Sequence, residues 1–183
     1  MHESSLEKMV AFRRKYLDAR HDEPLVIVDV GAFDVNGNYR HVFDAAPWRY
    51  LGLDVEMGPN VDILVPDPYD WSAEIDAESI DVVMSGSAFE HIEMFWRTAE
   101  QIGRILKPGG LLCIVAPASG PEHRCPVDCW RFYPDGLHVI ARCAGLETLE
   151  ARTEWEADRD YPDGSAVWKD SMLVARKPTP RVG

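Results

Sequence analysis

The chain has 183 residues, of which 46% are hydrophobic and 27% charged, and this composition indicates one soluble globular domain with a substantial core. Its net charge is −12, from 19 Lys and Arg against 31 Asp and Glu, without any run of basic residues. Proteins that grip nucleic-acid backbones usually carry a basic patch, so we expect no nucleic-acid partner.

The beginning of the chain is charged and lacks the apolar segment of a signal peptide. No apolar run approaches the roughly 18 residues of a membrane helix. We therefore expect a cytoplasmic protein with no membrane contact, in which Cys113, Cys125, Cys129 and Cys143 form no disulfides. Cys125 and Cys129 could be drawn with His123 as a zinc site, but their spacing fits the common pairs poorly and no second pair exists, so no metal is expected.

The first half of the chain predicts short strands between helices. An amphipathic helix is predicted over residues 4–20, with Ser4 and Glu7 as a capping box. Further helical segments are predicted over residues 38–45 and 70–75. Three apolar runs that end in turn residues predict buried strands, at 25–30, 50–54 and 61–65.

The second half continues this alternation. Residues 92–107 form the clearest predicted helix, because one face at the helical period is apolar. That face consists of Ile92, Phe95, Trp96, Ala99, Ile102, Ile105 and Leu106. A helix is also predicted from Pro134 to a C-terminal cap at Gly145. Strands are predicted over 80–85, 111–115, 146–151 and 171–175, with a long loop over 116–133 and an irregular acidic segment over 154–169.

Strands that alternate with helices predict an α/β fold whose mostly parallel sheet is covered on both faces. Such sheets bind ligands at the carboxyl ends of their strands. Polar and glycine-rich stretches follow five of the predicted strands, in residues 31–37, at Asp54, at Asp67, in residues 85–91 and in residues 116–131. The sequence therefore predicts one site at this edge.

The glycine and acid spacing favours a nucleotide-like ligand. Gly31 would let the backbone approach a ligand closely, although glycine after a strand is also ordinary turn chemistry. Asp54 follows Gly31 by about 20 residues, the spacing of a carboxylate that binds ribose hydroxyls, or else it begins a turn. Asp67 could meet the base of the ligand, or only stabilise a proline-rich turn.

Four stretches together resemble class I S-adenosylmethionine-dependent methyltransferases, and within them the bacterial small-molecule type known as type 11. They are Val-Asp-Val-Gly31, Tyr-Leu-Gly-Leu-Asp54, Ile-Asp-Val-Val-Met-Ser85, and Ile-Leu-Lys-Pro-Gly-Gly110-Leu-Leu, the last being the most specific. The segment from Pro126 to Phe132 also resembles one branch of the family, which is associated with glycan or natural-product pathways.

The resemblance implies a three-layer Rossmann-like domain over residues 1–183, with a seven-stranded sheet whose last strand is antiparallel. It implies an N-terminal helix over 1–21 and a flexible tail over 176–183. It also implies that the cofactor is S-adenosylmethionine and that the product formed from it is S-adenosylhomocysteine. The implied cofactor residues are Asp29, Gly31, Ala32, Phe33, Gly37, Asp54, Val55, Asp67, Pro68, Ser85 and Gly86.

The chain departs from the family in its first loop. The family commonly has glycine at every second position after the acid, whereas here Phe33 and Val35 stand where two further glycines are expected. We therefore expect a longer loop, bent differently, that closes at Gly37.

A methyl acceptor with a high pKa needs a base, and His91 and His123 are the candidates for this role. His91 could also simply pack at a helix start. Ser87 and Phe89 are candidates for lining the pocket. The candidate acceptor-binding residues are Glu90, Arg124, Asp128, Trp130 and Arg131, unless the loop only packs on itself through Arg131 and Asp128.

The predicted function is methyl transfer to a small molecule, with a hydroxyl oxygen of a sugar or natural product as the favoured acceptor. Residues 85–88 lack the Pro-Pro motif expected for adenine or glutamine nitrogen. A nicotinamide-dependent oxidoreductase is disfavoured because the chain has no Gly-x-Gly-x-x-Gly. A non-catalytic binding subunit also remains open, since the small chain leaves little room for a lid. The N-terminal helix, or a second copy in a homodimer, could supply one.

Overall fold

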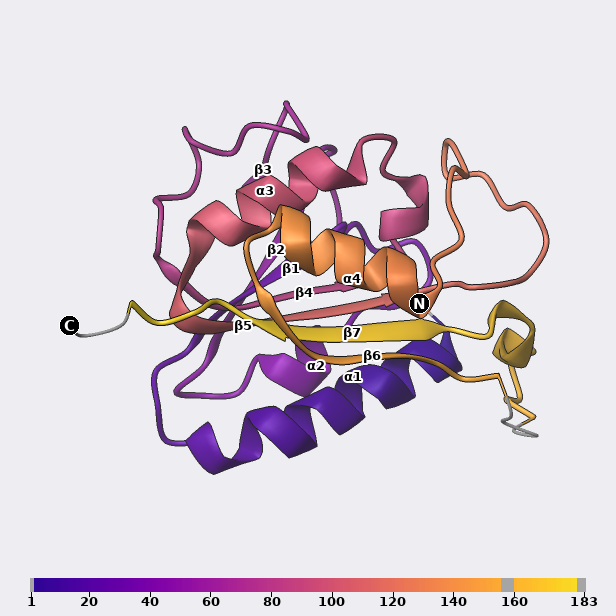
Figure 1. The fold of residues 1–183 in the computed structure, drawn as a ribbon, viewed down its shortest axis with the longest axis horizontal. Coiled ribbons are helices and arrows are strands. Elements are labelled where there is room, and N and C mark those ends of the chain that lie inside the picture. Colours follow the sequence, from indigo (N-terminus) through magenta and orange to yellow (C-terminus); the bar gives the residue numbers. More distant parts are fainter. Residues whose placement is uncertain (1, 156–159, 181–183) are drawn as a thin grey trace.

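The computed structural model describes residues 2–155 and 160–180, and within them a seven-stranded sheet forms the centre of the molecule (Figure 1). The strand order is β3-β2-β1-β4-β5-β7-β6. The strands are β1 (Val26–Val30), β2 (Arg49–Asp54), β3 (Ile63–Leu64), β4 (Ile80–Gly86), β5 (Leu106–Ala116), β6 (Glu147–Thr153) and β7 (Ser171–Arg176). The first five strands of this order, β3, β2, β1, β4 and β5, pair in parallel with their neighbours, whereas β7 is antiparallel to both β5 and β6. The predicted fold class is confirmed, with the last strand antiparallel.

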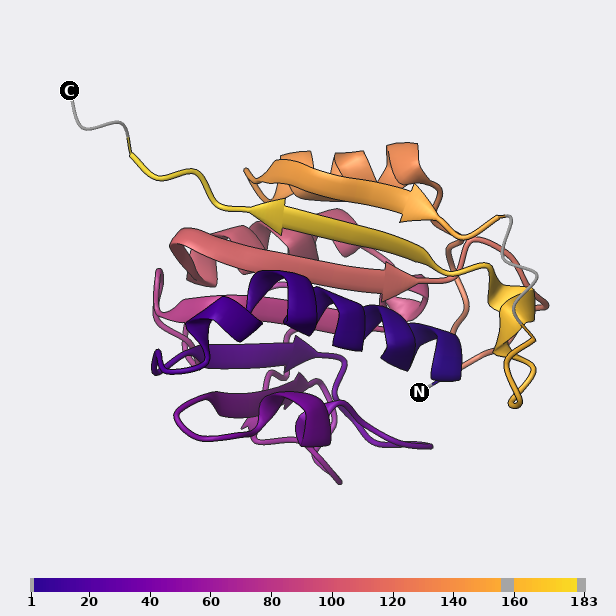
Figure 2. The same ribbon diagram turned by 90° about the horizontal axis from the view of Figure 1, so that it is seen from below.

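Helices cover both faces of the sheet and complete three layers. They are α1 (Glu3–Tyr16), α2 (Arg40–Phe43), α3 (Phe95–Ile105) and α4 (Pro134–Cys143), with short 3-10 turns η1 (Asp18–Arg20), η2 (Phe89–His91) and η3 (Ser165–Trp168). Figure 1 shows α3 and α4 on one face and α1 and α2 on the other. Figure 2 looks onto the second face and shows α1 in front of the sheet.

Alternate residues of the central strands enter two separate cores. In β1, Val28 packs in the core under α3 and α4, whereas Ile27 packs in the core under α1. In β4, Val83 and Met84 divide in the same way. A strand that is buried on both faces is mostly apolar, and for this reason these strands appear in the sequence as nearly continuous apolar runs, with Asp29 and Ser85 as buried polar exceptions.

Helix α1 begins differently from the prediction. The N-cap position is His2, whose side chain makes no capping hydrogen bond, so the predicted capping box is wrong. The first N–H groups of the helix, those of Glu3 and Ser4, donate to the side chains of Asp163 and Ser165. The hydroxyl of Ser4 instead donates a hydrogen bond to Asp170 at the start of β7, where both side chains are buried. The start of α1 packs near the start of β7. Ser4 therefore bonds to Asp170, which is distant in the sequence, and not to a residue of its own helix. The predicted helix over 4–20 is divided into α1 and η1.

Helix α3 is shorter than the predicted helix 92–107. Leu106 already pairs with Ile80 as the start of β5, so the chain becomes extended before the glycines. Trp96, predicted to lie on the buried face, is 40% exposed, and this expectation is wrong. The neighbouring Phe95 is the residue that packs against the core, and adjacent helical positions point about 100° apart.

Other predicted elements are present with different bounds. The predicted helix 38–45 is the single turn α2, and the predicted strand 61–65 is only β3. Residues 70–75 form turns, in which the indole of Trp71 donates to the carbonyl of Pro68 at 3.1 Å. Helix α4 begins at Pro134, and Gly145 has the positive φ of +67° expected after a helix end.

The ends of the described chain are tied to the sheet. Lys177, in the predicted flexible tail, donates from its backbone to Gly110 and from its Nζ to the carbonyls of Gly103 and Leu106. Residues 181–183 of that tail, and residues 156–159 of the predicted irregular segment, lie outside the described residues. Among the described residues, no helix is long and apolar enough to cross a membrane.

Candidate functional site

The predicted site residues gather where the parallel strands end. The backbone N–H of Gly31, after β1, donates to the carbonyl of Leu53 in β2 at 3.0 Å. The N–H of Ser87, after β4, donates to Val115 in β5 at 2.9 Å. These bonds join the loops that follow four neighbouring strands, so the topology brings the candidate segments to one edge.

Gly31 is required by the fold itself. Its φ is +78°, which residues with a Cβ rarely adopt. A Cβ at Gly31 would overlap the methyl group of Ala88, which follows β4. The glycine therefore lets the first loop and the loop after β4 approach each other closely. Its neighbour Ala32 is buried and donates its N–H to the same carbonyl of Leu53.

Asp54 is anchored by the backbone at the end of β2. Its Oδ2 accepts the N–H of Phe33 at 2.9 Å, and its Oδ1 accepts those of Val55 at 2.7 Å and Glu56 at 3.2 Å. The carboxylate is half-buried. Each carboxylate oxygen can accept more than one hydrogen bond, so this fixed group keeps capacity for hydroxyl donors.

Asp29 lies below the surface of the site. It is 2% exposed, and its Oδ2 accepts a hydrogen bond from the hydroxyl of Tyr50 at 2.5 Å. Burial raises the pKa of Asp29 to about 7, although the hydrogen bond from Tyr50 acts in the opposite direction. This carboxyl supports the first loop from inside the fold.

The residues after β4 combine buried polar groups with a strained backbone. The hydroxyl of Ser85 donates to the carbonyl of Val30 at 2.7 Å, which joins β4 to β1 at their ends. A Cβ at Gly86 would overlap the ring of Tyr39. Ser87 has a φ of +55°, and its buried hydroxyl has no hydrogen-bond partner among the described residues. Such strained residues with unsatisfied groups cluster at functional sites.

The outer loops of the predicted cofactor site are more exposed. Asp67 is exposed and accepts the N–H of Tyr69 at 2.8 Å, as an acid in a turn does. Pro68 is half-buried. Gly37 has a φ of +119° and donates to Asp34 at 2.6 Å, which closes the first loop as expected.

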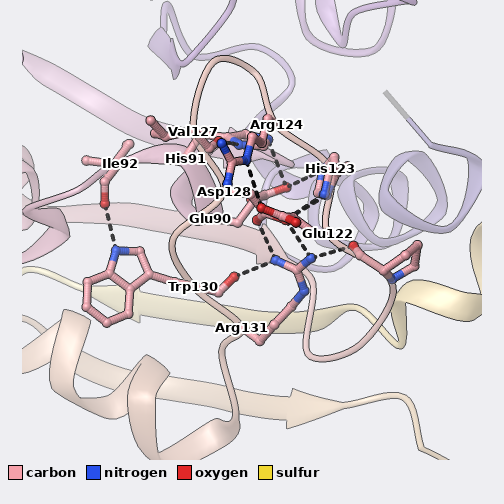
Figure 3. A network of polar contacts seen from close by, with 11 residues as sticks. Glu90, His91, Ile92, Glu122, His123, Arg124, Val127, Asp128, Trp130 and Arg131 are labelled. Atoms are coloured by element: carbon pink, nitrogen blue, oxygen red, sulfur yellow. Dashed lines mark hydrogen bonds and ion pairs between the residues drawn. The ribbon is translucent and has the colours of Figure 1, made fainter.

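The second half of the site is a cluster of ionisable side chains (Figure 3). Glu90 and His91 come from η2, directly after β4, and His123 and Asp128 come from the loop between β5 and α4. The Nε2 atoms of His91 and His123 lie 3.8 and 3.9 Å from Oε1 of Glu90. We call Glu90, His91 and His123 the Glu–His cluster.

Burial controls the electrostatics of the Glu–His cluster. The side chain of Glu90 is 1% exposed, and this burial raises its pKa to about 8. Burial, together with the neighbouring His91, lowers the pKa of His123. The cluster therefore favours a protonated carboxyl and a neutral imidazole when nothing else is bound.

His91 is held in one tautomer. Its Nδ1 lies 2.5 Å from the backbone carbonyl of Val127, and a carbonyl oxygen only accepts hydrogen bonds. Nδ1 therefore carries the hydrogen, and the lone pair of Nε2 faces Glu90. An imidazole oriented in this way can accept a proton or bind a cation through Nε2.

Asp128 and Arg131 support the cluster from the loop side. Arg131 binds Asp128 through two hydrogen bonds, at 2.6 and 2.9 Å, and these bonds hold the pKa of Asp128 well below its usual range. Asp128 also accepts the backbone N–H of His123 at 2.7 Å. The predicted alternative, a loop stabilised by this ion pair, is therefore present, and the pair borders the candidate site at the same time.

The two remaining predicted acceptor residues lie farther out. The indole of Trp130 donates to the carbonyl of Ile92 at 2.9 Å, and its ring packs edge-on against Phe95. Arg124 is exposed and pairs with Glu122, so the structure does not bring it into the Glu–His cluster. Of the two residues predicted to line the pocket, Phe89 has its ring fully buried in the core instead. Ser87 lies after β4, as described above.

Trp168 is a part of the site that the sequence did not indicate. The centroid of its ring lies 4.5 Å from that of the His123 ring. Its backbone carbonyl accepts hydrogen bonds from the N–H groups of Ala118 and Ser119. Gly120 makes room for this ring, because a Cβ there would overlap it. Trp168 belongs to the segment interpreted as irregular, and no periodic pattern marks it.

Cys125 and Cys129 are exposed. Within the part of the chain that the structure describes, the group with potential metal-binding geometry is the Glu–His cluster, which contains neither cysteine. The structure therefore does not bring Cys125 or Cys129 into this group with His123.

Comparisons with known proteins identify the fold. A family model described as a methyltransferase domain matches residues 36–114, less than half of the chain. A search of curated proteins found no match. Among solved structures, the 1,6-didemethyltoxoflavin-N1-methyltransferase of Burkholderia thailandensis, solved with S-adenosylhomocysteine, has a TM-score of 0.69 at 18% identity, covering 96% of this chain and 79% of that one.

Two further structures extend the comparison. A chain of the complex between the Haloferax volcanii Trm112 methyltransferase activator and a protein assigned as a methyltransferase has a TM-score of 0.63 at 23% identity, covering 97% of this chain and 99% of that one. The [4+2]-cyclase SpnF has a TM-score of 0.67 at 19% identity, and the match covers 95% of this chain and 81% of that one. Together with the matched domain, these neighbours confirm the resemblance to class I methyltransferases, and the cyclase shows that the fold alone does not define the reaction.

Proposed function

We propose that this chain transfers the methyl group of S-adenosylmethionine to a small-molecule acceptor, and that the acceptor atom is a hydroxyl oxygen. The observation that carries the proposal is the arrangement of two adjoining half-sites at one sheet edge. One half contains Gly31 and the anchored carboxylate of Asp54, and the other contains the Glu–His cluster. The match of residues 36–114 to a methyltransferase domain supports the same reaction.

The first half-site suits this cofactor. Asp54 offers fixed carboxylate oxygens for ribose hydroxyls, and exposed Asp67 lies in the next loop for the adenine. The unpartnered hydroxyl of Ser87 gives a buried polar atom that a bound ligand would satisfy. Asp29 acts indirectly, by holding Tyr50 under the loop. When bound, the cofactor supplies an electrophilic methyl group on a sulfonium.

The second half-site receives the acceptor. His91 has its Nε2 lone pair free of hydrogen, so it takes the proton from the acceptor hydroxyl as the oxygen is methylated. His123 is the second candidate for this role. Glu90 lies beside both nitrogens, and the Asp128–Arg131 pair fixes the loop that carries His123. The chain's main contribution is to align the acceptor oxygen with the methyl group.

A non-catalytic subunit with the same fold is the second candidate function. It is motivated by the neighbour solved with a methyltransferase activator and by exposed apolar side chains near the site, among them Val55 and Met57. This alternative predicts cofactor binding without turnover by the isolated chain.

The test begins with thermal unfolding in the presence of S-adenosylhomocysteine, with NAD in parallel. A ligand at 100 times its dissociation constant stabilises by about 2.7 kcal/mol, or about 5–10 °C in a chain of this length. Transfer of labelled methyl groups to a panel of sugars and phenols follows. A shift with NAD alone would refute the proposal, and a shift with S-adenosylhomocysteine but no transfer to any acceptor would favour the non-catalytic subunit.

A further inference from the structure

The Glu–His cluster has the composition and shape of a cation site. Its three candidate ligand atoms, one carboxylate oxygen and two imidazole nitrogens, lie within 4.8 Å of one another. They come from η2 and from the loop between β5 and α4, which Figure 3 shows meeting at this point. Two imidazoles with one carboxylate form a recurrent ligand set for transition-metal ions in proteins.

One oxygen of the Glu90 carboxyl has no hydrogen-bond partner among the described residues. This atom, Oε2, is buried. The two histidine Nε2 atoms lie 3.8 and 3.9 Å from Oε1, which is too far for a hydrogen bond, and a backbone hydrogen bond within Glu90 itself offsets only part of the rise in the pKa of this carboxyl. A buried carboxylate oxygen without a hydrogen bond is costly, and a bound ligand would satisfy it.

Both histidines have an oxygen atom behind them, although only His91 makes a hydrogen bond to it among the described residues. Nδ1 of His91 donates to the carbonyl of Val127, and Nδ1 of His123 faces Oδ2 of Asp128 at 3.4 Å. Metal-binding histidines are generally oriented in this manner, because the outer acceptor fixes the tautomer and directs the other nitrogen at the ion. Here both Nε2 atoms are directed toward Glu90.

Arg131 completes this outer layer. Its two hydrogen bonds keep Asp128 charged and in place. Trp168 packs against the ring of His123 and restricts its movement. The surroundings of the cluster are thus hydrogen-bonded and packed, whereas Oε2 of Glu90 at its centre has no hydrogen-bond partner among the described residues.

We propose that Glu90, His91 and His123 bind a divalent cation of the zinc type through one carboxylate oxygen and two Nε2 atoms. In a tetrahedral zinc site such ligands lie about 3.3 Å apart. Each Nε2 would therefore move about half an ångström toward Oε1 of Glu90, and the widest of the three separations, now within 4.8 Å, would close by up to about 1.5 Å. Three protein ligands leave one coordination position open, which is the pattern of a catalytic rather than a structural ion.

The open position would bind the oxygen of the methyl acceptor, and this part of the inference rests on the proposed function. A bound cation lowers the pKa of a hydroxyl group, so its proton is released to solvent. The oxygen lone pair then forms the new C–O bond, and the electron pair of the broken C–S bond remains on sulfur. Nε2 of His91 can bind either a proton or the cation. When the cation is bound there, His91 is a ligand, and the cation replaces His91 as the group that promotes loss of the acceptor proton.

The direct test is metal content. The full chain is treated with a chelator, incubated with zinc chloride, desalted and measured by mass spectrometry, and cobalt chloride serves as a spectroscopic probe. We expect one zinc per chain and a visible cobalt band. H91N, H123N and E90Q should each weaken zinc binding by at least 100-fold, whereas the double variant C125S/C129S and the variant H138N should bind zinc like the original chain.

Retention of zinc in H91N and H123N, loss of zinc in C125S/C129S, or no zinc bound to the original chain would each overturn the inference. H123N alters a half-exposed residue, so it remains informative if E90Q fails to fold. The same samples are heated with S-adenosylhomocysteine. Zinc bound without a shift from that ligand would refute the proposed function alone, and a shift without zinc would refute the cation site alone.

Discussion

The hydroxyl of Tyr50 in β2 donates a hydrogen bond to Oδ2 of Asp29 in β1 at 2.5 Å, inside the sheet and directly under the candidate cofactor loop. Asn60 donates in turn to the hydroxyl of Tyr50 at 3.1 Å. Arg40 lies over the ring of Tyr50, and its charge and that of Asp54 act on Asp29 in opposite directions. A titratable group is therefore buried within the framework of the site.

The first prediction is a pH dependence of stability that originates at Asp29. Its pKa is raised from 3.8 to about 7 by burial, so between these pH values the folded state binds more protons than the unfolded state. The free energy of unfolding should then fall as pH rises through this window, by at most about 1.4 kcal/mol per pH unit, and level off above it. D29N keeps an oxygen for Tyr50 and removes the titration.

Urea unfolding of the original chain and of D29N from pH 4 to 8 checks this prediction. Burial also raises the pKa of Glu90 and Asp170, which contribute with the same sign, so the difference between the two proteins is the relevant quantity. That difference should grow in favour of D29N as pH rises. Parallel curves would show that Asp29 is already charged in the folded protein.

The second prediction separates backbone strain from steric overlap at Gly31. Gly31 and Gly145 both have a positive φ, but a Cβ at Gly145 meets no atom within 4 Å, whereas one at Gly31 meets Ala88. G145A should cost about 1–2 kcal/mol from strain alone. G31A should cost about 1–3 kcal/mol more, because the overlap forces the two loops apart. Urea unfolding gives both values, and equal losses would contradict the close approach.

The third prediction concerns the cofactor. D54N removes the charge that would bind the ribose hydroxyls, and we expect the dissociation constant for S-adenosylhomocysteine to rise about 10–100-fold, as for a hydrogen bond to a charged group. D70N is the control, because Asp70 also accepts a backbone N–H in a turn but is exposed and is not among the candidate cofactor residues. Calorimetric titration measures both. An unchanged constant in D54N would remove Asp54 from the cofactor site.

The fourth prediction concerns proton transfer at His91. In H91N the rate constant for methyl transfer to a hydroxyl acceptor should fall by about 10²–10⁴, with little change in binding of S-adenosylhomocysteine. His21 provides a matched control, since its Nδ1 also faces a backbone carbonyl, that of Asp18 at 3.0 Å, on an exposed turn. H21N should retain full activity. An H91N variant with unchanged rate would mean that alignment of the reactants suffices.

The alternation of strands and helices could be predicted from the sequence because the central strands, such as β1 and β4, are buried on both faces and therefore form apolar runs. The bounds of α1 and α3 could not, because distant partners determine them. Ser4 bonds to Asp170 instead of capping α1, and Leu106 pairs with Ile80 instead of extending α3. Local patterns contain no information about such partners.

The position of the candidate site could be predicted from the sequence, whereas most of the contacts within it could not. The carboxyl ends of the strands indicated where Glu90, His91 and His123 would meet, but not that Val127 fixes the tautomer of His91 through its carbonyl. A backbone acceptor has no sequence signature. The role of Trp168 was also hidden, since a loop residue is placed by the tertiary structure and not by any period.

The position of β7 between β5 and β6 has a consequence for the order in which the site can form during synthesis. The parallel strands β1 to β5, and with them Gly31 and Asp54, precede residue 117 in the chain. The loop between β5 and α4 is supported by Trp168 and β7, which leave the ribosome much later. Long-range pairing of this kind is slow. A nascent chain would therefore possess the framework for the cofactor well before it could hold an acceptor.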